Sequence, residues 1–135
     1  MKVFVVRQPW AWLIATGQKD IENRNWATKY RGPLLIQASA NLPAKWDFEE
    51  CCEFARKKGV KKLPGRDEFE KGGIVGMVQL DDCVTRHRSK WFEGSVGWVL
   101  SKPKKLKFTP LKGQLGLFDP PERVLRKLGL KKRSR

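Results

Sequence analysis

The most informative segment of the chain is Gly17-Gln18-Lys19-Asp20-Ile21-Glu22-Asn23-Arg24. It follows an apolar stretch, residues 9–16. Pro9 at the start of this stretch and Gly17 directly after it predict a short helix. Three charged side chains, Lys19, Glu22 and Arg24, then crowd the point at which a strand should enter the core. A core strand does not need such charge, so this segment deserves a functional interpretation.

An extended conformation of residues 20–26 would project Glu22, Arg24 and Trp26 from one face, because side chains alternate along a strand. The opposite face would carry two asparagines beside a single isoleucine. Burial alone does not explain this composition. We therefore expect the strand to line a polar cavity.

Two neighbouring segments extend the pattern, namely Arg7-Gln8-Pro9-Trp10-Ala11 and the stretch 31–39, Arg-Gly-Pro-Leu-Leu-Ile-Gln-Ala-Ser. Together with the spacing Gly-x-Lys-x-x-Glu-x-Arg they resemble the signature of the ASCH family, a group of small domains with a PUA-like β-barrel. The resemblance covers most of the chain and is sharpest over residues 3–39. It implies an RNA or nucleotide ligand, with enzymatic activity in some branches.

By this resemblance, Lys19, Glu22 and Arg24 are the pocket residues of the family. Lys19 would supply a compact positive charge, Arg24 a planar fork of donors, and Glu22 an acceptor for amine or imino groups. Without the resemblance, the same three residues would be interpreted as an ion-pair network that fixes a turn.

An enzyme is the alternative to a binding domain. One branch of the superfamily hydrolyses acylated cytidine with the signature lysine and a threonine at the position of Glu22, and a metal-independent ribonuclease using Lys19 is a further possibility. If the chain is an enzyme, Lys19 and Glu22 are its catalytic residues. The threonine is absent here, and Gln37 stands where related strands carry histidine. We therefore prefer binding to turnover.

Other candidate ligand-binding residues surround this segment. Arg7 beside the start of a helix suits a phosphate, Ser39 follows a buried strand, and Trp12 either offers a stacking surface to a base or packs under the C-terminal segment. The predicted ligand-binding set is Arg7, Gln8, Trp12, Lys19, Glu22, Arg24, Trp26 and Ser39.

The formal net charge of +15 is distributed unevenly. Residues 1–85 carry 14 Lys or Arg against 11 Asp or Glu, whereas residues 86–135 carry 15 against 3. A positive field of this kind favours a polyanion, so we predict RNA or a modified nucleotide as partner, with DNA as an alternative. A solubilising surface and a protein-interaction tail are the competing interpretations. The predicted phosphate contacts are Arg86, Arg88, Lys104, Lys105, Arg126, Lys131, Lys132 and Arg133.

Short strands mixed with helices predict an α+β fold, a small PUA-like β-barrel with two or three flanking helices. Strands are expected at residues 2–6, 20–26, 34–36, 73–80 and 96–100, helices at 46–58 and 121–129, and connecting segments at 59–73 and 102–118. We assign residues 1–121 to the ASCH-like domain and residues 122–135 to a basic C-terminal helix and tail.

The remaining features exclude several classes of protein. No apolar run approaches the length of a membrane span, and no secretory segment is visible, so a cytoplasmic location is expected. Cys51 and Cys52 are adjacent, which suits small core residues better than a disulfide framework or a zinc site. We expect no metal and no cofactor, and the sequence does not indicate an oligomeric state.

Overall fold

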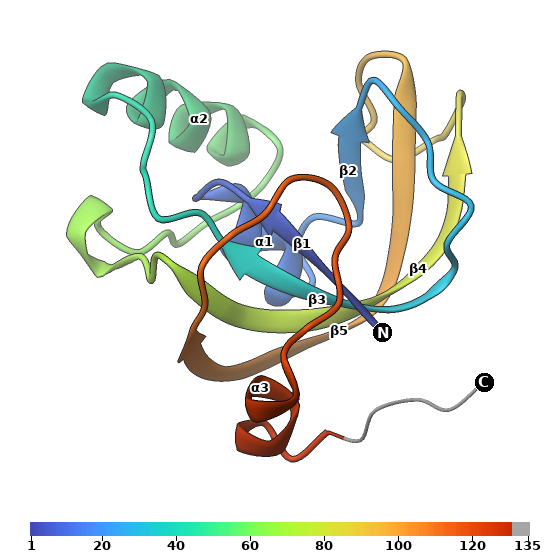
Figure 1. Ribbon diagram of the computed structural model, residues 1–135. Coiled ribbons are helices and arrows are strands. Elements are labelled where there is room, and N and C mark those ends of the chain that lie inside the picture. Colours follow the sequence, from blue (N-terminus) through green and yellow to red (C-terminus); the bar gives the residue numbers. More distant parts are fainter. Residues whose placement is uncertain (131–135) are drawn as a thin grey trace.

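Five strands form one curled sheet in the order β1-β3-β4-β5-β2 in the computed structural model, which describes residues 1–130 (Figure 1). The elements in chain order are β1 (Lys2–Val6), α1 (Trp10–Ala15), β2 (Ile21–Arg24), β3 (Gly32–Ala38), α2 (Lys45–Lys57), the 3-10 turn η1 (Arg66–Glu68), β4 (Gly73–Val84), β5 (Val96–Pro110) and α3 (Glu122–Lys127). Only β1 and β3 pair in parallel. The predicted α+β, barrel-like fold with flanking helices is confirmed.

The β3 strand is the centre of the core because both of its faces are covered. Leu34 and Ile36 pack on the α1 side of the sheet, in a cluster that includes Ile14 and the fully buried Trp98. Leu35 packs on the other side, in a cluster with the α3 residues. Three successive apolar residues predicted this two-sided burial.

The β5 strand is longer than predicted, because it continues to Pro110 through a segment that we expected to be irregular. The register with β4 shifts here: Met77 pairs with Lys104 and Gln79 with Ser101, which leaves Lys102 and Pro103 in a bulge. Lys102 accordingly has a positive φ of 51°. A bulge tolerates a proline, which cannot donate a hydrogen bond to a regular ladder, so the strand continues through Pro103. The prediction that residues 102–110 belong to a connecting segment was therefore wrong.

Helix α1 lies almost directly on β4, and this contact positions the segment that follows the helix. A Cβ atom added to Gly76 would lie 2.6 Å from the Ala15 Cβ atom and 2.9 Å from the Lys104 carbonyl oxygen. The close approach therefore depends on the missing side chain at position 76. Helix α2 packs through Phe48, Cys52 and Ala55, whereas Cys51, which was expected on the same apolar face, is only half-buried. Within residues 1–130, no helix has the length and hydropathy needed to cross a bilayer.

We predict that Gly76→Ala destabilises the protein by about 1–3 kcal/mol, because the new methyl group overlaps backbone and helix atoms that cannot both move away. Urea unfolding followed by circular dichroism measures the free energy of unfolding. Gly113→Ala is the control, since its added Cβ would meet nothing closer than the Val5 Cγ2 atom at 3.3 Å. Equal stability of both variants would show that α1 does not need the close approach.

Candidate functional site

A cavity of about 800 Å³ opens between the carboxyl ends of β1 and β2 and the loop that follows β5. Arg7, Trp10, Glu22, Arg24 and Trp26 contribute to its walls. The remaining lining residues are Phe4, Val5, Val6, Asn23, Ser39, Gly113, Gln114, Leu115 and Gly116. The structure thus brings five of the eight predicted ligand-binding residues to one cavity, namely Arg7, Glu22, Arg24, Trp26 and Ser39.

Glu22 lies at the centre of an ion-pair network on β2. Its Oε1 atom is 3.3 Å from the Lys19 Nζ atom, and its Oε2 atom is 2.9 Å from the Arg24 Nη2 atom. Lys19 and Glu22 are only 6% and 7% exposed, whereas the Arg24 side chain is partly accessible. One carboxylate between two cations leaves a net positive charge at this position. Because the Arg24 side chain is partly accessible, part of that charge faces the cavity.

Lys19 lies behind this network in a side pocket of about 210 Å³, lined also by Trp10, Glu22, Phe54 and Trp91. Its ammonium group donates hydrogen bonds to the Ile21 carbonyl and to Glu22. The same group is 5.6 Å from the Trp10 ring centroid and 6.0 Å from that of Trp91, within range of a cation–π interaction. Lys19 therefore holds Glu22 from behind and does not line the main cavity.

Arg24 and Trp26 form an aromatic and cationic wall of the main cavity. The Arg24 guanidinium carbon is 4.4 Å from the Phe4 ring centroid, and its Nη2 atom donates to the Val5 carbonyl at 3.5 Å. Trp26 is 38% exposed and packs edge-on against the buried Trp98, at 5.0 Å between ring centroids. One edge of the Trp26 ring system is thus fixed by the core while the rest remains accessible.

The structure revises the expected role of the helix start next to Arg7. The Ala11 N–H donates to the Arg7 carbonyl, the Trp12 N–H to the Gln8 Oε1 atom, and the Leu13 N–H to the Pro9 carbonyl. These donors are already used, so they offer no phosphate site. The exposed Arg7 side chain itself still lines the cavity.

Gln8 and Trp12 lie away from the cavity lining. Gln8 is buried, and its amide joins the Trp12 N–H to the Glu70 carbonyl, so it anchors α1 to the segment before β4. Trp12 packs edge-on against Phe69 at 6.1 Å, beside Phe48. The expectation that Trp12 packs under the C-terminal segment was wrong, because Trp12 packs against the cluster formed by Phe69, which follows η1, and by Phe48 of α2.

Sequence reasoning missed two parts of the site. Asn23 donates to the Trp91 carbonyl and accepts from the Glu93 N–H, both at 2.8 Å, which clamps the segment before β5 onto β2. The loop 113–116 forms a wall although it lies about ninety residues beyond Glu22 in the chain. The two glycines that flank this loop were visible, but nothing in the sequence linked them to the cavity.

A second groove of about 490 Å³ meets the cavity at Arg7 and Trp10. It is acidic, because Asp47, Glu50 and Glu93 line it together with Pro43, Cys51 and Phe54. Burial raises the pKa of the Cys51 thiol, Cys52 and the nearby carboxylates raise it further, and Arg7 lowers it. Trp10 therefore separates a cationic cavity from an acidic groove.

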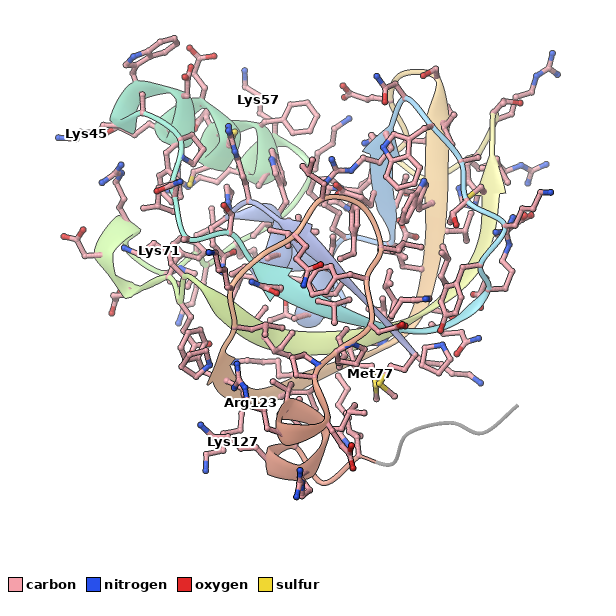
Figure 2. All side chains as sticks on the ribbon, in the orientation of Figure 1. Lys45, Lys57, Lys71, Met77, Arg123 and Lys127 are labelled. Atoms are coloured by element: carbon pink, nitrogen blue, oxygen red, sulfur yellow. The ribbon has the colours of Figure 1, made fainter. Side chains whose placement is uncertain are left out.

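The predicted phosphate contacts do not form one patch. Arg86 and Arg88 are exposed in the loop between β4 and β5, and Lys104 and Lys105 are exposed about 20 Å further along β5. Arg126 lies on α3, the helix from which Arg123 and Lys127 project on the side of the molecule away from α2 (Figure 2). The other three predicted contacts, Lys131, Lys132 and Arg133, lie outside the described residues.

A metal site was not expected, and residues 1–130 contain no group of three or more His, Cys, Asp or Glu side chains arranged to hold an ion. Asp82 instead forms an exposed ion pair with Arg31 at 3.4 Å. The absence of a cofactor stays a prediction.

Comparisons with known proteins bear on this geometry. The model of the ASCH domain family matches residues 5–110. The crystal structure of ASCH from Zymomonas mobilis has a TM-score of 0.54 to this chain at 13% sequence identity, covering 95% of this chain and 92% of that chain. That likeness concerns the fold.

Two curated relatives are mammalian. Activating signal cointegrator 1 of Homo sapiens is 34% identical over 85 residues, which are 63% of this chain and 15% of that protein. Activating signal cointegrator 1 of Mus musculus is 27% identical over 142 residues, or 96% of this chain and 24% of that protein. The chain thus spans about a quarter or less of the length of these relatives.

We predict that Glu22→Gln destabilises the protein by about 3 kcal/mol, because two cations then face each other in a largely buried site without their carboxylate. Urea unfolding measures the loss. Glu53→Gln is the matched control, since Glu53 pairs with Arg56 at 3.8 Å on the exposed face of α2 and should change stability by less than about 0.5 kcal/mol. Equal effects of the two substitutions would contradict a central role for Glu22.

For Cys51 we predict slow alkylation by iodoacetamide at neutral pH, because only the thiolate reacts and the raised pKa keeps the thiol protonated. Its rate should continue to increase at alkaline pH after the rate of an unstructured cysteine peptide has levelled off. Peptide mass spectrometry of the folded protein measures each cysteine separately. A Cys51 rate that levels off together with the peptide would contradict the expected shift.

Proposed function

Because the chain belongs to the ASCH domain family, we propose that its cavity binds a nucleotide, either free or as one unit of an RNA strand. The observation that carries this proposal is that two arginines, Arg7 and Arg24, line the same cavity as the buried carboxylate of Glu22. Guanidinium groups suit phosphate, and a carboxylate suits the amine and imino groups of a base. The family match supports the same class of ligand.

The size and lining of the cavity support a ligand of nucleotide dimensions. About 800 Å³ lies within the range of small-molecule sites, and the walls combine three aromatic rings with six polar or charged side chains. We assign the base to the side of Trp26 and Glu22, where the exposed part of the indole provides a stacking surface. The phosphate then faces Arg7, with the Ser39 hydroxyl between the two ends.

The outlying cations extend this site in our proposal. Lys104, Lys105 and Arg126 are exposed, so they are available to backbone phosphates of a longer strand. None of these three cations lines the cavity, so a mononucleotide held there does not contact them in this proposal. A longer RNA should therefore bind more tightly and with a steeper salt dependence than a mononucleotide does.

Binding is favoured over hydrolysis by the position of Lys19. Its ammonium group contacts Glu22, the Ile21 carbonyl and two tryptophan rings, and it does not line the main cavity. An oxyanion formed in that cavity would meet Arg24 before it met Lys19. The candidate catalytic pair Lys19 and Glu22 thus serves in this proposal to hold Arg24 in place. A cytoplasmic location and RNA in preference to DNA also remain predictions.

The test is fluorescence anisotropy with labelled short RNA, and competition by the four nucleoside monophosphates, at two salt concentrations. Arg7→Gln should weaken binding about tenfold at the lower salt concentration, because it removes a charge-assisted hydrogen bond to phosphate. Arg56→Gln is the control, since it removes the same charge from the exposed face of α2, outside the cavity. Equal losses in the two variants would show that only net charge matters and that the cavity is not the site.

A further inference from the structure

Leu115 is the most exposed large apolar side chain of residues 1–130, at 99% of its full accessible area. Only two others in this part of the chain are exposed, Trp26 at 38% and Trp46 at 65%. A single exposed leucine would be unremarkable by itself. Here, however, Leu115 and Trp26 line the same cavity, from the loop after β5 and from the segment after β2.

The loop that carries Leu115 is anchored at both ends. On one side the Gln37 Nε2 atom donates to the Leu111 carbonyl at 2.6 Å. On the other side Phe118 and Val3 exchange two backbone hydrogen bonds, at 2.7 and 3.2 Å. Gly116 takes a positive φ of 67°, which turns the chain back toward Phe118. The base of the loop is therefore fixed, and only its tip stands away from the protein.

Full exposure of a leucine forgoes the stabilisation that its burial would contribute. Within residues 1–130 this side chain belongs to none of the apolar clusters, although Leu111 and Phe118 at the two ends of the loop are buried. An apolar side chain held at the rim of a nucleotide-sized cavity has a specific use in nucleic-acid binding. Aliphatic side chains of this kind insert between stacked bases and separate them.

We propose that Leu115 is a wedge that separates a base from its stacked neighbour, so that the cavity receives a nucleotide extruded from a structured RNA strand. This inference rests on the proposed function and specifies its substrate as a base within a stacked strand. The extruded base enters between Trp26 and Glu22, and Leu115 takes its place against the neighbouring base. Lys112, exposed beside the loop, is placed to contact the adjoining phosphate.

Extrusion costs a few kcal/mol for a paired base and less for a base that is already unpaired. The contribution of a wedge to binding affinity should decrease in the same way. It should be largest for a fully paired duplex, smaller for a duplex with one bulged nucleotide, and absent for a mononucleotide, which has no neighbour to separate. This graded dependence distinguishes a wedge from an ordinary contact.

The experiment compares the unmodified protein with Leu115→Ala on three probes: a fully paired short RNA duplex, the same duplex with one bulged nucleotide, and nucleoside monophosphates. We expect Leu115→Ala to weaken duplex binding about tenfold, bulge binding less, and mononucleotide binding not at all. Leu115→Met should retain binding, because methionine is also apolar and has a similar volume. Trp46→Ala is the matched control, because Trp46 is also an exposed apolar side chain but lies on α2 outside the cavity lining, and this variant should bind all three probes normally.

An equal loss on all three probes would overturn the proposal, because Leu115 would then be a simple wall contact. Unchanged binding of both duplexes by Leu115→Ala would overturn it as well. In either case, loss of mononucleotide binding in Arg7→Gln would leave the proposed nucleotide site intact. If the unmodified protein bound none of the probes, the proposed function would fail, and the wedge with it.

Discussion

The Glu22 carboxylate is the group on which the site depends. It lies on β2, an edge strand that pairs only with β5, and it accepts from cations on both sides. Removing Lys19 and Glu22 from water is costly, so this network is weak evidence for stability. Its effect is geometric: Lys19 is held against the aromatic rings behind the strand, and Arg24 is held over Phe4 at the wall of the cavity.

Charged side chains are distributed among three adjoining pockets, which explains how a chain with a net charge of +15 presents surfaces of both signs. Trp10 lies where the cationic cavity, the side pocket of Lys19 and the acidic groove meet. The carboxylates of the groove repel phosphate, so the anionic ligand that we propose would reach Arg7 only from the cavity side. Aromatic contacts stabilise these boundaries: Phe4 stacks on Trp98, and Trp10 packs edge-on against Phe54 and Trp91.

Much of the fold was predictable because most of its helices and strands have a recognisable pattern within a few neighbouring residues. The periodicity of residues 46–58 predicted α2, and the apolar run 34–36 predicted a strand covered on both sides. The extension of β5 was not predictable, since Lys102 and Pro103 look like a strand end. A bulge opposite β4 absorbs both residues, and bulges depend on the register of the partner strand. The packing partner of Trp12 was also missed, because periodicity predicts which residues share a helix face but not which distant segment covers that face.

By itself the sequence determined the order of most elements, the signature of the family, the grouping of Lys19, Glu22 and Arg24, and the uneven charge along the chain. These properties follow from neighbours within a few residues, where strand alternation and helical periodicity apply. Only the tertiary structure decided that Lys19 lies behind the cavity, that Gln8 serves the fold, and that the distant loop 113–116 forms a wall. Those outcomes depend on how the sheet curls and on which segments it brings together, and contacts between distant segments leave no local pattern to be recognised.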